Sequence, residues 1–542
     1  MKKVLFITYY WPPAGGIAVH RNLKFVKYLR EFGYEPIVHT ADGAEYPVLD
    51  ENNFKVYSKS IINKEETTFS IIKDNLEKFL LIVSQFENQL TNKFDGEKID
   101  NSKSLLIKIC KLTNNNRKAL QTIFDFTNPT TIGKNDSFGF GDRIGLANAG
   151  HIRSLEKSIF KPILAQQSIR ELTRTNRTAE EVMDAAVWAV FQEGYKNGFG
   201  ADADHLKTTA DIDLTFNAGF TMFTFDPGEH VDNNADHYDE NKLLSVVANL
   251  PWKELNDTFP SAERRYLKKN FLISEYLTLQ VNETEFLKAY AKYGKAIAHI
   301  KKLYEHLKNI SNGKPFEVEV SVDETESVTS IFEHFFFANE LKRLNVEFVS
   351  LAPRFVGSFE KGIDYKGALK LFENEYRKHL AVTNYFGNYK ISLHSGSDKF
   401  SVYKVIGSIK GANTHVKTAG TSYLEALKVV AAKNPSLFRE IYDFSYGLYE
   451  TEKNSYHVSA DISKLKKENE ISDEELLELF SSNDARQVLH VTFGKVLTEK
   501  NLNEFLFKEK IIDCLKENEE THYEFLYNHF RKHLEPFEWV EN

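Results

Sequence analysis

The chain has 542 residues, of which 42% are hydrophobic and 27% charged, an ordinary globular composition with enough apolar material for a large core. The formal net charge of −8 argues against a general nucleic-acid binder, which would show a basic patch, and gives no support to an anionic membrane surface as a partner. Cys110 and Cys514 lie far apart and outside any CxxC pattern, which predicts reduced thiols in a cytoplasmic protein. No stretch approaches 18 consecutive apolar residues, so no transmembrane helix is expected.

Residues 1–52 have the pattern of a βαβ unit. The pattern consists of an apolar strand, KVLFITYY, an amphipathic helix over residues 19–33 that ends at Gly33, and a second strand, EPIVHT. The opening has too short an apolar region for a secretory signal. This segment resembles the start of a family-4 glycosyltransferase, with the turn at Gly15 and Gly16. Because only the first piece of such an enzyme is present, glycosyl transfer is not expected.

Residues 53–135 are rich in Asn, Lys, Glu and Ser, with short apolar runs such as FLLIVS and LLIKIC. We interpret this zone as an accessory α/β region with solvated loops. It contains no cluster of chemically competent side chains.

Residues 136–425 repeat one pattern, a short β-like run that ends in polar residues and is followed by a helical stretch. The eight runs are FGFGDRIGLAN, PILAQQS, GFGADADH, FTMFTFDP, FEVEVSVDET, VEFVSLAPRF, YKISLHSGSD and THVKTAG. Strands that alternate with helices indicate parallel pairing, and eight such units predict a closed (β/α)₈ barrel of the TIM type. Residues 426–542 are mainly helical and charged, and we expect them to form a C-terminal cap on the barrel.

In such barrels the active site forms at the carboxyl ends of the strands, so the polar residues that follow each run should converge. These residues are Asp142, Arg143, Gln166, Gln167, Asp204, His205, Asp226, Glu319, Asp323, Glu324, Arg354, His394, Ser395, Asp398, His415 and Lys417. Three histidines at three strand ends, His205, His394 and His415, predict a divalent-metal site that suits Zn, Ni, Mn or Co. If His205 and His394 share one cation, their imidazoles must lie within about 8 Å of each other.

The run ADADH is the strongest local indication of a catalytic site, because Asp204 directly precedes His205. If His205 binds a metal, Asp204 lies beside it and can move a proton to or from a bound substrate. Class II aldolases are similar, with an Asp-His pair and further histidines at the metal. SLHSGSDK also resembles the Gly/Ser-rich histidine turn of those enzymes.

Across nearly all of residues 53–540 the sequence resembles the tagaturonate epimerase family. The resembling stretches are FGFGDRIGLANAGHIRSL, PILAQQSIRE, VFQEGYKNGFGADADHLK, GFTMFTFDP, VEVSVDETE, FEKGIDYKG, YKISLHSGSDKFSVY, HVKTAGTSYLEA and SYHVSADIS. The resemblance implies interconversion of tagaturonate and fructuronate with a divalent cation. It implies Asp204 as proton acceptor, Glu319 as proton donor and His205 as metal ligand. His394 is implied as a further ligand more firmly than His415, whose place in the set comes mainly from its strand-end position.

The carbon inverted in this reaction lies two positions from the ketone, so its C–H bond is not acidified by the carbonyl. We therefore expect retro-aldol cleavage to an enediolate and an aldehyde, rotation of the aldehyde and re-closure, with the metal as Lewis acid. Arg354, Lys417 and Arg143 are candidates for binding the substrate carboxylate, and Gln167 is a further substrate-binding candidate.

Two alternatives remain open at this point, a class II-like metal-dependent aldolase or lyase that acts on a keto sugar acid, and a non-catalytic sugar-acid-binding protein. The expected partner is a small keto-uronate, and a homo-oligomer is possible.

Overall fold

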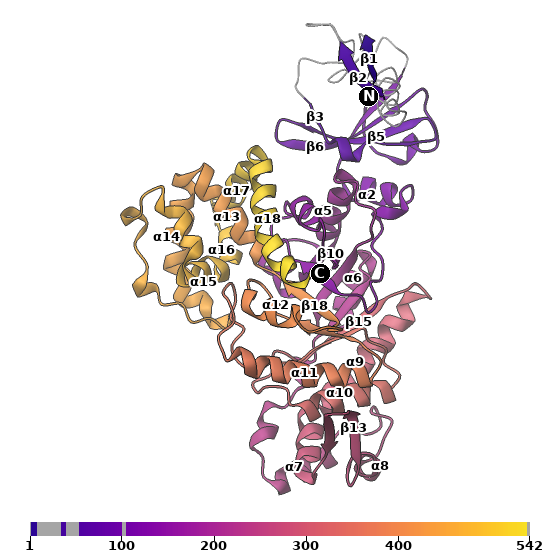
Figure 1. Cartoon of the computed structure of the whole chain (residues 1–542), viewed down its shortest axis with the longest axis vertical. Helices are drawn as coiled ribbons and strands as arrows, with labels where there is room; N and C mark the ends of the chain where they lie inside the picture. The colour runs from indigo at the N-terminus through magenta and orange to yellow at the C-terminus, as the bar shows by residue number, and fades with distance from the viewer. Residues whose placement is uncertain (1, 8–33, 40–53, 100–104, 539–542) are drawn as a thin grey trace. The chain divides into compact units, whose positions relative to one another are not determined.

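A computed structural model describes residues 2–7, 34–39, 54–99 and 105–538, the first two of these segments by their backbone alone. The chain divides into two compact units, Met1–Ala119 and Leu120–Asn542, and each is considered by itself. Figure 1 labels the elements in both units. Every side chain predicted for the active site belongs to the second unit.

The first unit consists mostly of strands. β1 (Lys2–Ile7) pairs in parallel with β2 (Tyr34–His39), while the helix predicted between them, over residues 19–33, lies outside the described residues. An antiparallel sheet follows, in the order β3-β5-β6-β8-β7 with β4 paired to β5. Its strands are β3 (Lys55–Val56), β4 (Ile62–Lys64), β5 (Thr67–Asp74), β6 (Glu77–Ser84), β7 (Glu97–Ile99) and β8 (Leu106–Lys111), and α2 (Asn114–Gln121) comes next. Along β6 Leu80 and Ile82 are buried, so one face of the sheet carries a core.

The second unit is built on a closed barrel of eight parallel strands, in the order β10-β11-β12-β15-β16-β17-β18-β9. The strands are β9 (Ser137–Phe140), β10 (Lys161–Ser168), β11 (Gly200–Leu206), β12 (Met222–Phe225), β15 (Glu317–Ser321), β16 (Ser350–Ala352), β17 (Lys390–Leu393) and β18 (Thr414–Thr418). Each overlaps one of the eight runs picked out in the sequence, so the (β/α)₈ prediction is confirmed. The pairing of β18 with β9 closes the cylinder. The domain boundaries drawn from the sequence stay a prediction.

Helices separate the strands and cover the outside of the barrel (Figure 1). They are α3 (Asn148–Ser154), α4 (Ile169–Thr175), α5 (Ala179–Gln192), α6 (Thr209–Asn217), α10 (Ile331–Arg343), α11 (Leu369–Tyr385), α12 (Phe400–Gly407) and α13 (Thr421–Lys433). Strand β9 shows the division of side chains between the two layers. Phe138 and Phe140 pack outward against Phe530, whereas Ser137 contacts His415.

A long insertion separates β12 from β15. It contains α7 (Glu240–Ala248), α8 (Phe259–Tyr266), the hairpin β13 (Asn270–Ser274) and β14 (Leu277–Gln280), and α9 (Glu283–Ser311). Helix α9 begins at a reciprocal cap, in which the side chains of Asn282 and Glu285 each accept the other's backbone N–H. It ends at Asn312, whose left-handed backbone stops the helix.

The helical C-terminal cap is also confirmed. It contains α14 (Pro435–Glu452), α15 (Asn483–Val491), α16 (Phe493–Thr498), the short hairpin β19 (Lys500–Asn501) and β20 (Glu504–Phe505), α17 (Lys508–Glu517) and α18 (Glu519–Leu534). Helix α18 approaches α3 closely at Gly150, where a Cβ atom would lie 2.7 Å from Leu526. The cap is therefore packed on the helical layer of the barrel.

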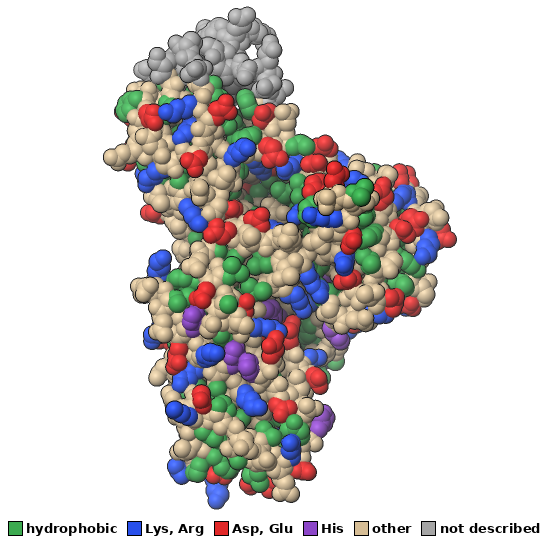
Figure 2. All heavy atoms as spheres, turned by 180° about the vertical axis from the view of Figure 1, so that it is seen from behind, with side chains coloured by type: hydrophobic (Ala, Val, Ile, Leu, Met, Phe, Trp, Pro, Cys, Tyr) green, Lys and Arg blue, Asp and Glu red, His purple; other side chains and the backbone are tan. Residues whose placement is uncertain are grey.

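Within the described residues no helix is both long and apolar enough to cross a membrane. Cys110 and Cys514 are both buried free thiols. Acidic and basic side chains are interspersed over the face seen in Figure 2, in keeping with the modest net charge of −8.

Candidate active site

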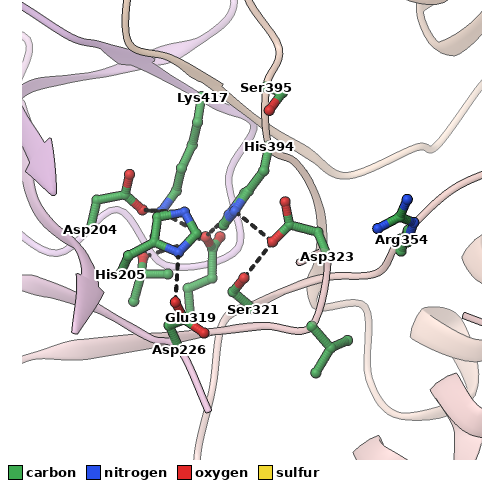
Figure 3. Close-up of polar contacts among 12 residues, drawn as sticks. Asp204, His205, Asp226, Glu319, Ser321, Asp323, Arg354, His394, Ser395 and Lys417 are labelled. Carbon is green, nitrogen blue, oxygen red and sulfur yellow. Dashed lines mark hydrogen bonds and ion pairs between the residues drawn. The ribbon is translucent and has the colours of Figure 1, made fainter. Parts of the chain in front are cut away.

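A break in strand β11 places two consecutive side chains in the same site. In a regular strand Asp204 and His205 would point to opposite faces of the barrel. The pairing with β12 shifts between Ala203 and Leu206, and His205 adopts a left-handed backbone with φ of 52°. Bulges of this kind re-aim side chains, and here both Asp204 and His205 face the barrel mouth (Figure 3).

The ammonium group of Lys417 on β18 joins three buried carboxylates, of which Figure 3 labels Asp204 and Glu319. Its Nζ lies 2.7 Å from Oδ2 of Asp202, 2.8 Å from Oδ1 of Asp204 and 2.8 Å from Oε1 of Glu319. It also donates to Oγ1 of Thr224 at 2.6 Å. Glu319 has no exposed surface, so Lys417 supplies the charge that makes this carboxylate tolerable inside the barrel.

Two of the three predicted metal-binding histidines, His205 and His394, lie side by side next to this cluster. The ring centroids of His205 and His394 are 5.1 Å apart, inside the limit of about 8 Å set from the sequence. Nδ1 of His205 lies 3.3 Å from Oδ2 of Asp226, and Nε2 of His394 lies 2.7 Å from Oε1 of Glu319. Oδ1 of Asp323 lies 3.1 Å from Nδ1 of His394.

The carboxylates of the site raise the pKa values of the two neighbouring histidines. Burial alone would lower the pKa of His205, but Asp204 and Asp226 outweigh burial and raise it to about 10. Burial would also lower the pKa of His394, yet Asp323 and Glu319 raise it to about 9. Without a cation, the two protonated histidines thus balance part of the negative charge, and a bound metal would take the place of a proton on each.

The pKa values of the carboxylates Asp202 and Asp204 are shifted in opposite directions. Burial raises the pKa of Asp202 to about 6 against the opposing charge of Lys417. Burial would raise the pKa of Asp204 as well, but His205, Lys417 and His394 together hold it below its usual range. Asp204 is therefore ionised at neutral pH and can accept a proton.

The donor set fits a divalent cation. One ligand atom from each of Asp204, His205 and His394 can be chosen so that all lie within 4.8 Å of one another, near the separation of ligands around a single ion. Nδ1 of His394 is buried, and Asp323 lies 3.1 Å from it. A mixed imidazole and carboxylate set suits Zn, Ni, Mn or Co. A second group, His205, Asp226 and Glu324, shares one of these histidines.

His415 lies in a different layer of the barrel interior. It stands two residues before Lys417 on β18, about 6–7 Å nearer the amino end of the strand and therefore deeper below the mouth of the barrel. Its Nδ1 lies 2.9 Å from Oγ of Ser137, and burial lowers its pKa to about 3. The structure does not bring it into a group of metal donors with His205 and His394.

The four predicted substrate-binding residues lie in different surroundings. Lys417 is at the centre of the site, and Arg354 lines a cavity of about 250 Å³ that also contacts His394. Arg143 is instead paired with Glu171 at 2.9 Å and is 3% exposed. Gln167 is buried, and neither of its amide atoms has a hydrogen-bond partner among the described residues.

Three further residues of the site were missed by the sequence reasoning. Asp202 stands inside β11 rather than at its end, although its two-residue spacing from Asp204 was a usable signal. Arg170 and Lys361 line the cavity beside His394 from α4 and from the loop after β16. No local pattern marks either of them in the sequence.

The loop that follows His394 is anchored from behind by the C-terminal cap. Asp398 pairs with Nη2 of Arg486 at 2.7 Å and with Nε2 of His529 at 2.6 Å. Nδ1 of His529 lies 3.0 Å from Glu425, and the backbone N–H of Asp398 donates to Nε2 of His533 at 3.1 Å. The ring nitrogens that face Asp398 are thus already occupied, so we interpret this cluster as an ionic anchor although its geometry could suit a metal.

The comparisons with known proteins agree over most of the chain. The family model of tagaturonate epimerase matches residues 57–537. The tagaturonate/fructuronate epimerase of Thermotoga maritima is 41% identical over 490 residues, which cover 90% of this chain and 97% of that protein.

Solved structures of a fructuronate-tagaturonate epimerase from Cohnella laeviribosi are also similar. The native crystal structure is 38% identical with a TM-score of 0.84, and covers 90% of this chain and 96% of its own. A complex with one glycerol is 36% identical with a TM-score of 0.83, and covers 96% and 99%. This chain belongs to the tagaturonate epimerase family.

Proposed function

We propose that the protein interconverts tagaturonate and fructuronate by retro-aldol cleavage and re-closure, with a divalent cation held by His205, His394 and Asp204. The observation that carries this proposal is the convergence of these three residues with Glu319 and Lys417 at one mouth of the barrel. The relatives named above supply the substrate pair.

The cation, when bound, would act as a Lewis acid toward the ketone side of the substrate. Ionised Asp204 accepts the proton of the hydroxyl on the carbon to be inverted. The bond from this carbon to the carbon beside the ketone breaks, and its electron pair moves toward the ketone oxygen. After the aldehyde turns, the same bond re-forms on its other face and the proton returns.

Glu319 is the second group that handles protons. Burial would raise its pKa, but Lys417 and His394 hold it well below the usual value, so it is ionised until a proton reaches it. Nζ of Lys417 lies 2.8 Å from both Glu319 and Asp204. The ammonium therefore gives the two carboxylates a common path for the proton, which supports Asp204 as acceptor and Glu319 as donor.

The test is an assay of tagaturonate turnover by NMR in ²H₂O, after chelation and after addition of Zn, Ni, Mn or Co separately. We expect fructuronate to form only with added metal, without deuterium at the inverted carbon, since retro-aldol chemistry breaks a C–C bond there. His205→Ala should lose bound metal and turnover together. Deuterium at the inverted carbon would refute the retro-aldol route, and saturable binding without turnover would favour a sugar-acid-binding protein.

A class II-like aldolase or lyase on the same barrel is distinguished in the same spectra, since a released three-carbon fragment would favour it. The cytoplasmic location and the possible homo-oligomer stay predictions.

A further inference from the structure

The cavity beside the catalytic residues is lined by side chains of both charges. His394, Asp323 and Glu324 line it next to the proposed metal site. Arg170, Arg354 and Lys361 also line the cavity, together with Ser455, Tyr456 and His457 from the C-terminal cap. Its volume of about 250 Å³ suits one small molecule.

These three cations have no carboxylate partner. In the part of the chain that the structure describes, no ion pair within 4.0 Å joins a carboxylate to Arg170, Arg354 or Lys361, although such pairs are frequent elsewhere in the molecule. Nζ of Lys361 donates to Oγ of Ser395 at 2.7 Å. Burial and then the nearby charge of Arg170 lower the pKa of Lys361, and together they outweigh Glu324, Asp323 and Glu171, which would raise it. Two like charges held near each other, Lys361 half-buried and Arg170 exposed, favour the binding of an anion between them.

The loop that carries Lys361 is fixed before any ligand arrives. Nζ of Lys399 donates to the carbonyl oxygens of Glu360 at 2.8 Å and Ile363 at 2.5 Å. The backbone N–H of Lys361 donates to the carbonyl of His457 at 3.4 Å, which ties the loop to the cap. The ammonium is therefore held in place at little further entropic cost on binding.

The opposite wall, which carries Arg170, is fixed in a similar way. Arg174 donates from Nη1 to the hydroxyl of Tyr456 and from Nη2 to Oγ of Ser455 at 3.1 Å. The guanidinium of Arg170 lies 5.6 Å from the ring centroid of Tyr456. Segment Ser455–His457, which the sequence left without a role, thus builds this wall of the cavity.

We propose that Lys361 and Arg170 bind the carboxylate of the keto sugar acid in this cavity, and so select acids over neutral ketohexoses. Arg354 is the weaker candidate, because its Nη1 already donates to the carbonyl of Thr325. The inference rests on the proposed function, since it places the substrate with its ketone toward the proposed metal site. A neutral ketohexose has a CH₂OH group instead of the carboxylate and gains nothing from the two cations.

The test compares tagaturonate with D-tagatose on metal-replenished full-length protein. For Lys361→Met we expect kcat/KM for tagaturonate to fall about 100-fold, the worth of a charge-assisted contact in a partly desolvated site. The value for D-tagatose should change by less than about threefold. Arg170→Met should act in the same direction by about tenfold, and its exposed position keeps the test valid if Lys361→Met fails to fold.

Controls separate this proposal from the proposed function. Lys378→Met removes a surface lysine paired with Glu375 on α11, and should leave both substrates unaffected. Equal losses for acid and neutral sugar in Lys361→Met, or an acid-specific loss only in Arg354→Met, would overturn the assignment. If the wild-type protein does not turn tagaturonate over, the proposed function fails by itself. Calorimetric Kd values for the two sugars in wild type and Lys361→Met then still decide whether Lys361 selects acids.

Discussion

Replacement of His529 by Gln tests the ionic anchor behind the His394 loop. Burial would lower the pKa of His529, but Glu425 and Asp398 outweigh burial and raise it from 6.5 to about 9. Because the folded protein binds this proton more tightly than the unfolded chain, the stabilisation is complete below about pH 6.5 and is lost as the pH rises through about 9.

The structure sets the size of the effect. Each pH unit between the two pKa values corresponds to about 1.4 kcal/mol, so the charge of His529 stabilises the fold by about 3 kcal/mol near pH 6. With about 2 cal/mol/K of unfolding entropy per residue in a unit of more than 400 residues, this loss lowers Tm by about 3 °C. Gln keeps a hydrogen-bond donor toward Asp398 but removes the charge and the contact of Nδ1 with Glu425.

The assay is the Tm of wild type and His529→Gln, measured by differential scanning fluorimetry in chelator from pH 6 to pH 10. We expect the Tm of His529→Gln to lie about 3 °C below that of wild type at pH 6, and this difference in Tm to disappear above about pH 9. His306→Gln is the control, because His306 pairs with Asp213 at 2.7 Å at a site where Asp213 is 50% exposed, and its gap should stay below about 1 °C. A gap for His529→Gln that does not change with pH would refute the reasoning, since packing rather than charge would then hold the loop.

Three further changes have defined outcomes. Asp226→Asn removes the carboxylate that orients His205 and should weaken metal binding about 10–100-fold in a competition assay with a metal-sensitive dye; unchanged metal affinity would contradict this role. Lys417→Met leaves buried carboxylates without their cation and should destabilise the metal-free protein by about 3–5 kcal/mol in urea unfolding, with partial rescue by Mn²⁺; equal stability of the two proteins would contradict the assigned role. Gly141→Ala would place a Cβ atom 2.5 Å from the carbonyl oxygen of Thr418, and we expect a loss of about 1–3 kcal/mol in the same unfolding assay.

The barrel was predictable because each strand is short, apolar and followed by polar residues, a pattern that repeats eight times. The same pattern identified Asp204, His205 and His394, since each stands where a strand meets the mouth of the barrel. Sequence spacing also placed Lys417 at the site. It could not reveal that the ammonium would pair with three carboxylates, because two of these come from β11 and the third comes from β15.

The sequence did not predict which layer of the barrel interior a residue occupies, or which side chains it pairs with. His415 and Lys417 are two residues apart on β18, so both face the barrel interior. This spacing does not say which of them lies at the mouth of the barrel. Arg143 follows strand β9 as a substrate-binding residue would, yet Glu171, which lies on α4 after the next strand, neutralises it. Lys361 lies in a long loop whose path depends on packing against the cap, and no local pattern encodes such a path.

The kink at His205 has a consequence for anyone who wishes to transplant this chemistry. An Asp-His dipeptide grafted onto an undistorted strand of another barrel would deliver one group to the pore and the other to the helical layer. A graft must therefore include the backbone bulge at His205 and the neighbouring strand β12, whose pairing with β11 shifts at this point. The two side chains alone are not enough.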